Sequence, residues 1–163
     1  MNPLRFDHLE LTVPRGALTP EYRAELDAFY CPIFGWTSNE HHYAAQVGHM
    51  YRPDARSFVL LMEDDEPMEA PSYTATDALG DTQFFPHIGL LCETNEELDE
   101  LLEGCLQFQR KDSRVEIKEF PPFIDETRWS RNFVVKYLLP FWFDVHVILP
   151  KPGHEPERDW RYS

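Results

Sequence analysis

The feature that most constrains the fold is a short pattern that occurs twice, with a histidine at the same place in both copies. Residues 6–13 and 85–92 alternate apolar side chains with small or polar ones, which is typical of a β-strand. His8 lies in the first segment and His87 in the second, and a helix-like stretch follows each. Two similar halves packed face to face would bring these imidazoles together, and converging imidazoles are the beginning of a metal site.

The segments after each histidine predict the same order of elements. Thr19 and Pro20 suit the start of a helix, because threonine caps helix N-termini and proline fits the first turn. Thr94 and Glu97 form a capping box before a second helix. The apolar stripe of that helix is Leu98, Leu101, Leu102 and Cys105. Further strands are predicted from residue 36 onward and at 42–52, 57–62, 115–120, 133–139 and 141–149. The order βαβββ therefore occurs twice, which predicts an α+β fold.

We predict a single domain spanning residues 1–163, with four parts. Module one covers about 5–63, a linker 64–84, module two 85–150 and a tail 151–163. The linker contains many Asp, Glu, Pro, Ala and Thr residues. Two roles stay open for it, a solvated tether and a lid over a site.

The charge and composition of the chain limit the kinds of partner that it can bind. The net charge of −14 predicts that the chain binds neither nucleic acid nor an anionic membrane surface, because both would repel it. The N-terminus lacks the apolar core of a signal peptide, so a cytoplasmic location is expected. Cys31, Cys92 and Cys105 show no CxxC spacing, and we interpret Cys92 and Cys105 as reduced core residues.

The end of the second module carries a resemblance to a known family. Residues 137–147 read YLLPFWFDVHV, in which Pro140 holds the place of a family turn and His146 stands where a ligand glutamate is expected. With the two βαβββ modules, this ending resembles the vicinal oxygen chelate superfamily of glyoxalase I, extradiol dioxygenases and bleomycin-resistance proteins. The resemblance covers roughly residues 5–150. It implies two paired βαβββ modules that form a half-open barrel around a divalent metal.

The resemblance also implies a ligand set of His8, His87 and His146. In module one the family's ligand position at the end of the module falls on Val59 or Leu60, so that module offers no carboxylate. A set of three ligands matches the ligand positions of the extradiol dioxygenases, whereas glyoxalase I has four ligands and needs a glutamate in each module. The family pattern therefore favours a dioxygenase-like enzyme whose small-molecule substrate chelates the metal through adjacent oxygens. Fe(II) is the favoured cofactor, and Zn(II), Ni(II) or Mn(II) are the other candidates.

Strand alternation supports the ligand set independently. His8 shares a strand face with Glu10, and His146 shares one with Asp144, while their apolar neighbours point the other way. Glu10 and Asp144 are candidates for orienting the ligand histidines or for a general base. Tyr137 is a candidate donor to a bound oxyanion. The more conservative interpretation, in which these side chains are ordinary packing or solvated residues, stays open.

A second class of function also stays open, a metal-free binding protein that sequesters a planar aromatic molecule against Trp and Phe side chains. The aromatic run 141–143 is expected to form a dimer contact, and the protein is expected to be a homodimer. Four histidines are left outside the site. They are His41, His42, His49 and His154.

Overall fold

The computed structural model describes residues 6–69 and 87–154. The chain divides into two compact units, unit one at Met1–Ala70 and unit two at Pro71–Ser163. Most of the predicted linker and the end of the predicted tail lie outside the described residues. No helix of the described part is long and apolar enough to span a membrane.

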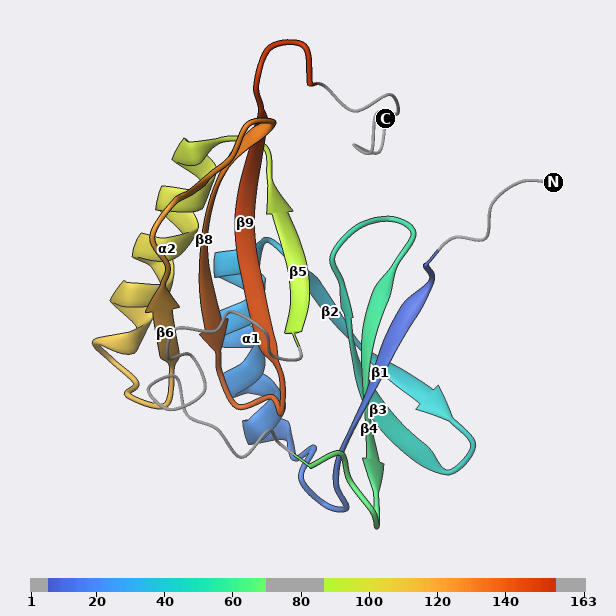
Figure 1. Ribbon diagram of the computed structural model, residues 1–163. Helices are drawn as coiled ribbons and strands as arrows, with labels where there is room; N and C mark the ends of the chain where they lie inside the picture. The colour runs from blue at the N-terminus through green and yellow to red at the C-terminus, as the bar shows by residue number, and fades with distance from the viewer. Residues whose placement is uncertain (1–5, 70–86, 155–163) are drawn as a thin grey trace, which may run out of the picture. The chain divides into compact units, whose positions relative to one another are not determined.

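Unit one contains one helix and a four-stranded sheet (Figure 1). Its elements are β1 (His8–Pro14), α1 (Pro20–Phe34), β2 (Thr37–Tyr43), β3 (Gln46–Arg52) and β4 (Phe58–Asp64). The strand order is β1-β4-β3-β2, with β1 parallel to β4 and the other pairs antiparallel. His42 belongs to β2 rather than to the start of the next strand, because the chain turns at Ala44, whose φ is 51°.

Unit two repeats this plan with one added strand. Its elements are β5 (His87–Cys92), α2 (Asn95–Gln109), β6 (Glu116–Glu119), β7 (Phe123–Ile124), β8 (Arg128–Lys136) and β9 (Trp142–Pro150). The order is β5-β9-β8-β6, and the short β7 pairs with β8. β5 is parallel to β9, as β1 is to β4. The predicted α+β class and the predicted repeat are confirmed.

Both helices begin at the predicted caps. The Thr19 hydroxyl accepts a hydrogen bond from the Tyr22 amide at 3.2 Å, and the Thr94 hydroxyl accepts one from the Glu97 amide at 3.1 Å. The Glu97 carboxylate accepts from the Glu93 amide rather than from the expected amide of Thr94. Within α2 the buried residues are Leu98, Leu102 and Cys105, while Leu101 is half-buried.

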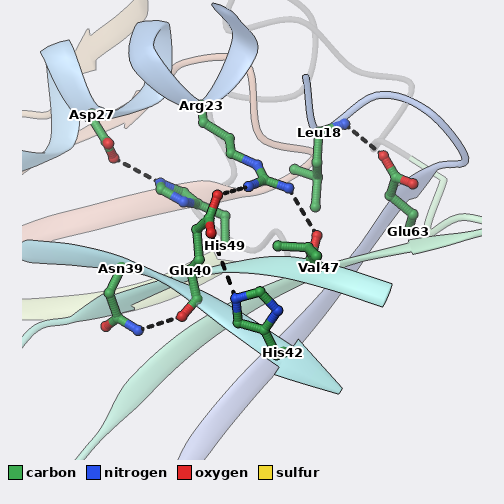
Figure 2. Close-up of polar contacts among 9 residues, drawn as sticks. All are labelled: Leu18, Arg23, Asp27, Asn39, Glu40, His42, Val47, His49 and Glu63. Carbon is green, nitrogen blue, oxygen red and sulfur yellow. Dashed lines mark hydrogen bonds and ion pairs between the residues drawn. The ribbon is translucent and has the colours of Figure 1, made fainter. Parts of the chain in front are cut away.

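Polar contacts join α1 to the sheet of unit one. Arg23 donates to the Glu40 carboxylate on β2 at 2.8 Å and to the Val47 carbonyl on β3 at 2.9 Å (Figure 2). One turn further along α1, Asp27 Oδ1 lies 2.7 Å from His49 Nε2. Because each carboxylate on one element bonds a cationic or imidazole group on the other, the contacts align α1 with β2 and β3.

The same Asp27 oxygen also accepts a hydrogen bond from the Tyr51 hydroxyl at 2.9 Å. Tyr51 is fully buried and His49 is 4% exposed. Burial, together with the Asp27 carboxylate, raises the pKa of Tyr51 far above its ordinary value. These contacts give His49 a structural role between α1 and β3.

Two residues of the aromatic run 141–143 are buried within the chain, and Phe141 is half-buried. Trp142 and Phe143 are both fully buried, although adjacent strand residues point to opposite faces. The expected dimer contact is therefore wrong for these two side chains. β9 lies between β5 and β8, and a central strand is covered on both faces more readily than an edge strand.

The two buried cysteines are free thiols, which confirms their interpretation as reduced core residues. Burial raises the pKa of Cys92 to about 11 and that of Cys105 to about 12. Both thiols are therefore protonated and unreactive at neutral pH.

Gly48 on β3 supplies a first prediction. A Cβ atom there would lie 2.7 Å from the Leu61 carbonyl oxygen and closer still to the Met62 sulfur. Because that carbonyl belongs to β4, relief requires the β3–β4 pairing to move. We expect Gly48→Ala to lower the free energy of unfolding by about 1–3 kcal/mol in a denaturant titration. Val47→Ala, next to it and partly exposed, should cost less than about 0.5 kcal/mol. Equal effects would show that Gly48 is not tightly packed.

Candidate functional site

Three of the predicted site residues converge on one face of the sheet in unit two. Asp144 Oδ2 lies 3.3 Å from His146 Nδ1 and 3.7 Å from His87 Nε2. His146 and Asp144 are two residues apart on β9, and His87 begins the parallel strand β5. Their side chains are 23%, 16% and 34% exposed in that order, so the group is partly open to solvent. Strand alternation had predicted this common face.

The strand register explains why the imidazole of His146 fits there. Gly89 on β5 is paired with Asp144, and Leu91 is paired with His146. A Cβ atom on Gly89 would lie only 3.3 Å from Cε1 of His146. The missing side chain of Gly89 therefore leaves the space in which the ring lies.

Asn132 is a site residue that the sequence analysis missed. It lies on β8 directly opposite His146, and its Nδ2 donates to Asp144 Oδ1 at 2.7 Å. The signal that could have located it is the register of the β8–β9 hairpin across the Pro140 turn.

The surroundings of Asp144 keep its carboxylate ionised. Burial acts to raise the pKa of Asp144, but the hydrogen bonds from His146 and Asn132 and the charges of the two imidazoles outweigh it. The pKa therefore lies below its ordinary value. An ionised carboxylate between two imidazoles can orient one of them or accept a proton.

His8 lies at the start of β1 in unit one. Its Nδ1 is 2.8 Å from Asp7 Oδ2, and its ring stacks on Phe58 with centroids 4.9 Å apart. The side chain is 44% exposed. His8 and His146 thus share one arrangement, since each places Nδ1 against a carboxylate. Among the described residues, neither ring makes a hydrogen bond through Nε2.

The two other predicted site residues lie in different surroundings. Glu10 is exposed on the same face of β1 as His8. Tyr137 is 1% exposed, and its hydroxyl donates to Asp112 at 2.9 Å and accepts from Arg114 at 3.3 Å. The structure therefore places the Tyr137 hydroxyl in a buried contact with the loop that follows α2.

The register also locates the counterparts of Asp144 and His146 in unit one. On β5, the residues two and four positions after His87 are paired with Asp144 and His146. On β1, the residues two and four positions after His8 are paired with Leu60 and Met62. The family frame had pointed to Val59 or Leu60, so the position that matches His146 is Met62 instead. Both counterparts are apolar and buried.

No group of three or more histidine, cysteine, aspartate and glutamate side chains within residues 6–69 and 87–154 is arranged to hold a metal ion. The donors of unit two are thus not a closed metal cage. They are two imidazoles and a carboxylate that is already hydrogen-bonded.

Comparison with solved structures identifies the fold. A glyoxylase/bleomycin resistance protein/dioxygenase domain from Frankia sp. EAN1pec aligns with a TM-score of 0.53 and 16% identity, over 94% of this chain and 96% of its own. The fosfomycin resistance protein FosX from Listeria monocytogenes aligns with a TM-score of 0.53 and 18% identity, over 90% of this chain and 91% of its own. The chain has a glyoxalase-like fold.

A variant of FosX solved with Mn(II) and 1S,2S-dihydroxypropylphosphonic acid aligns with the same fold, at a TM-score of 0.51 and 16% identity, over 87% of this chain and 90% of its own. No protein-family model matches the sequence, and neither does any curated protein. The predicted resemblance to the vicinal oxygen chelate superfamily is therefore confirmed by structure, at the level of the fold.

Asp144 supplies a prediction within this glyoxalase-like fold. Asp144→Ala removes the acceptor of Asn132 and of His146, which leaves polar groups unpaired in a partly buried place. We expect the free energy of unfolding to fall by about 1–3 kcal/mol. Asp99→Ala is the matched control, because Asp99 forms an exposed ion pair with Arg131, worth about 0–1 kcal/mol. A loss at Asp144 no larger than that at Asp99, measured by urea titration, would contradict the network.

Proposed function

We propose that the protein is a metal-dependent enzyme that acts on a small molecule which binds the metal through adjacent oxygen atoms. The observation that carries this proposal is the shared arrangement of His8 and His146. Each places Nδ1 against a carboxylate, through Asp7 and Asp144, and directs Nε2 elsewhere. Metal-ligating histidines typically have this second contact, because it sets the tautomer and the orientation of the ring.

In this proposal the metal ligands are the three histidines that the family resemblance implies, His8, His87 and His146. Three neutral imidazoles suit a divalent transition metal and favour Fe(II) over Zn(II), Ni(II) or Mn(II). The bound metal would supply a Lewis acid that polarises the chelated oxygens of the substrate. The FosX structure with Mn(II) supports a divalent metal in this fold.

The apolar counterparts in unit one favour dioxygenase-like chemistry over that of glyoxalase I. Leu60 and Met62 lie where a second carboxylate would be needed, and neither can accept a proton. Two carboxylates are candidates for proton transfer: Glu10, which is exposed, and Asp144, which is held by Asn132. Asp144 is the better placed of the two to act beside His146. A homodimer in the cytoplasm belongs to the same proposal.

Metal content tests the ligand set. We expect about one equivalent of a transition metal per chain, measured by elemental analysis of protein purified without a metal-binding tag. His8→Ala, His87→Ala and His146→Ala should each lose it, because each removes one of three donors. His42→Ala is the matched control, since His42 is exposed and its Nε2 lies 3.6 Å from the Glu40 carboxylate.

Metal-free wild-type protein, even after anaerobic reconstitution with Fe(II), Zn(II), Ni(II) or Mn(II), would contradict the enzyme proposal. If the metal is present, oxygen uptake with catechol-like substrates and turnover of dicarbonyl substrates separate the dioxygenase-like from the isomerase-like activity.

The second candidate is a metal-free protein that sequesters a planar aromatic molecule. It is favoured by the missing glutamates, since Leu60 and Met62 stand where unit one would need a carboxylate and His146 stands where a glutamate is expected. Binding through stacking should survive a chelator, whereas binding through a chelated metal should not. We therefore expect tryptophan fluorescence titrations with catechol-like ligands to lose their saturable change in EDTA. A change that persists in EDTA, in protein shown to be metal-free, would favour the sequestering protein.

A further inference from the structure

We propose that Asn132 and Asp144 are positioning residues that hold the neutral His146 ring in the tautomer with its proton on Nδ1. The Nε2 lone pair is then presented as the donor to a metal. The use of that lone pair rests on the proposed function, but the tautomer itself is a property of the metal-free protein.

The chain of contacts crosses the β8–β9 hairpin. Asn132 Nδ2 donates to Asp144 Oδ1 at 2.7 Å, which leaves Oδ2 facing His146 Nδ1 at 3.3 Å. An ionised carboxylate only accepts hydrogen bonds, so the proton of this contact is carried by Nδ1. In a neutral imidazole the other nitrogen, Nε2, is then the acceptor.

Strand geometry makes Asn132 the residue that can do this. It is the antiparallel partner of His146, so its side chain lies on the same face as Asp144 and His146. Its neighbour on that face of β8 is Val134, which is fully buried and pairs with Asp144. An amide beside such an apolar residue is stabilised by its bond to a charged acceptor.

Asp144 is hydrogen-bonded to one of the two imidazoles and lies at ion-pair distance from the other. Its Oδ2 is 3.7 Å from His87 Nε2, which is too long for a hydrogen bond, whereas the contact with His146 is within range. A Cβ atom on Gly89, on the neighbouring strand, would lie 3.3 Å from Cε1 of His146, so the glycine leaves room for the ring. The carboxylate contact is then what orients the ring in that space.

The direct test is the ¹⁵N spectrum of the His146 ring in metal-free protein, at a pH where the imidazole is neutral. We expect the Nδ1–H tautomer in the wild type. Asn132→Leu should move the ring toward the Nε2–H tautomer, because the carboxylate loses its anchor. Asp144→Asn should do so more strongly, since an amide N–H then faces Nδ1. Ser130→Ala, on the same face of β8 and opposite Ile148, should leave the tautomer unchanged.

The second readout is affinity for Zn(II) by competition titration. Asn132→Leu should weaken binding by about 10- to 100-fold while the number of sites stays the same, as expected for a residue that orients a ligand. Unchanged affinity in Asn132→Leu would overturn the positioning role.

The two proposals fail in different ways. An Nε2–H tautomer in wild-type His146, or a tautomer that neither variant changes, overturns the positioning role whether or not metal binds. The expected tautomers in a protein that binds no metal uphold the positioning by Asn132 and Asp144 and overturn the proposed enzyme. The wild-type spectrum decides the tautomer even if a variant does not fold.

Discussion

The parallel pairing of the first and last strand in each unit is the constraint on which the candidate site depends. In unit two it places Gly89 opposite Asp144, and it brings His87 onto the same face as Asp144 and His146. A shift of the register by one residue would turn the histidines of β9 to the opposite face, because side chains alternate along a strand. The geometry of the site is therefore set by backbone pairing, and side-chain hydrogen bonds refine it.

The chain uses the same residue types for two different purposes. In unit one Asp27, His49 and Tyr51 form a closed network in which the imidazole is 4% exposed, and this network joins α1 to the sheet. In unit two Asp144 and His146 form a similar carboxylate–imidazole contact that remains partly open. The buried imidazole of the first network joins α1 to the sheet, whereas the partly open imidazole of the second can meet a ligand.

Much of the fold was predictable because it depends on local patterns. The caps at Thr19 and Thr94 and the repeated strand–helix order come from neighbouring residues, and all of them are present. The role of Asn132 was not predictable in this way, since it depends on which residue of β8 lies opposite His146. Trp142 was misplaced for a related reason, because only the position of β9 inside the sheet shows that both of its faces are covered.

The sequence by itself determined the repeat, the α+β class and the faces on which the strand histidines lie, because strand periodicity and helix capping act over a few residues. The tertiary structure decided which side chains meet. It joined Asn132 to Asp144, placed the His146 ring over Gly89, and gave Leu60 and Met62 the positions that Asp144 and His146 hold in unit two. These contacts depend on the register between strands. The pairs β1–β4 and β5–β9 join residues that are distant in the sequence, whereas the β8–β9 register is set across the turn that connects the two strands.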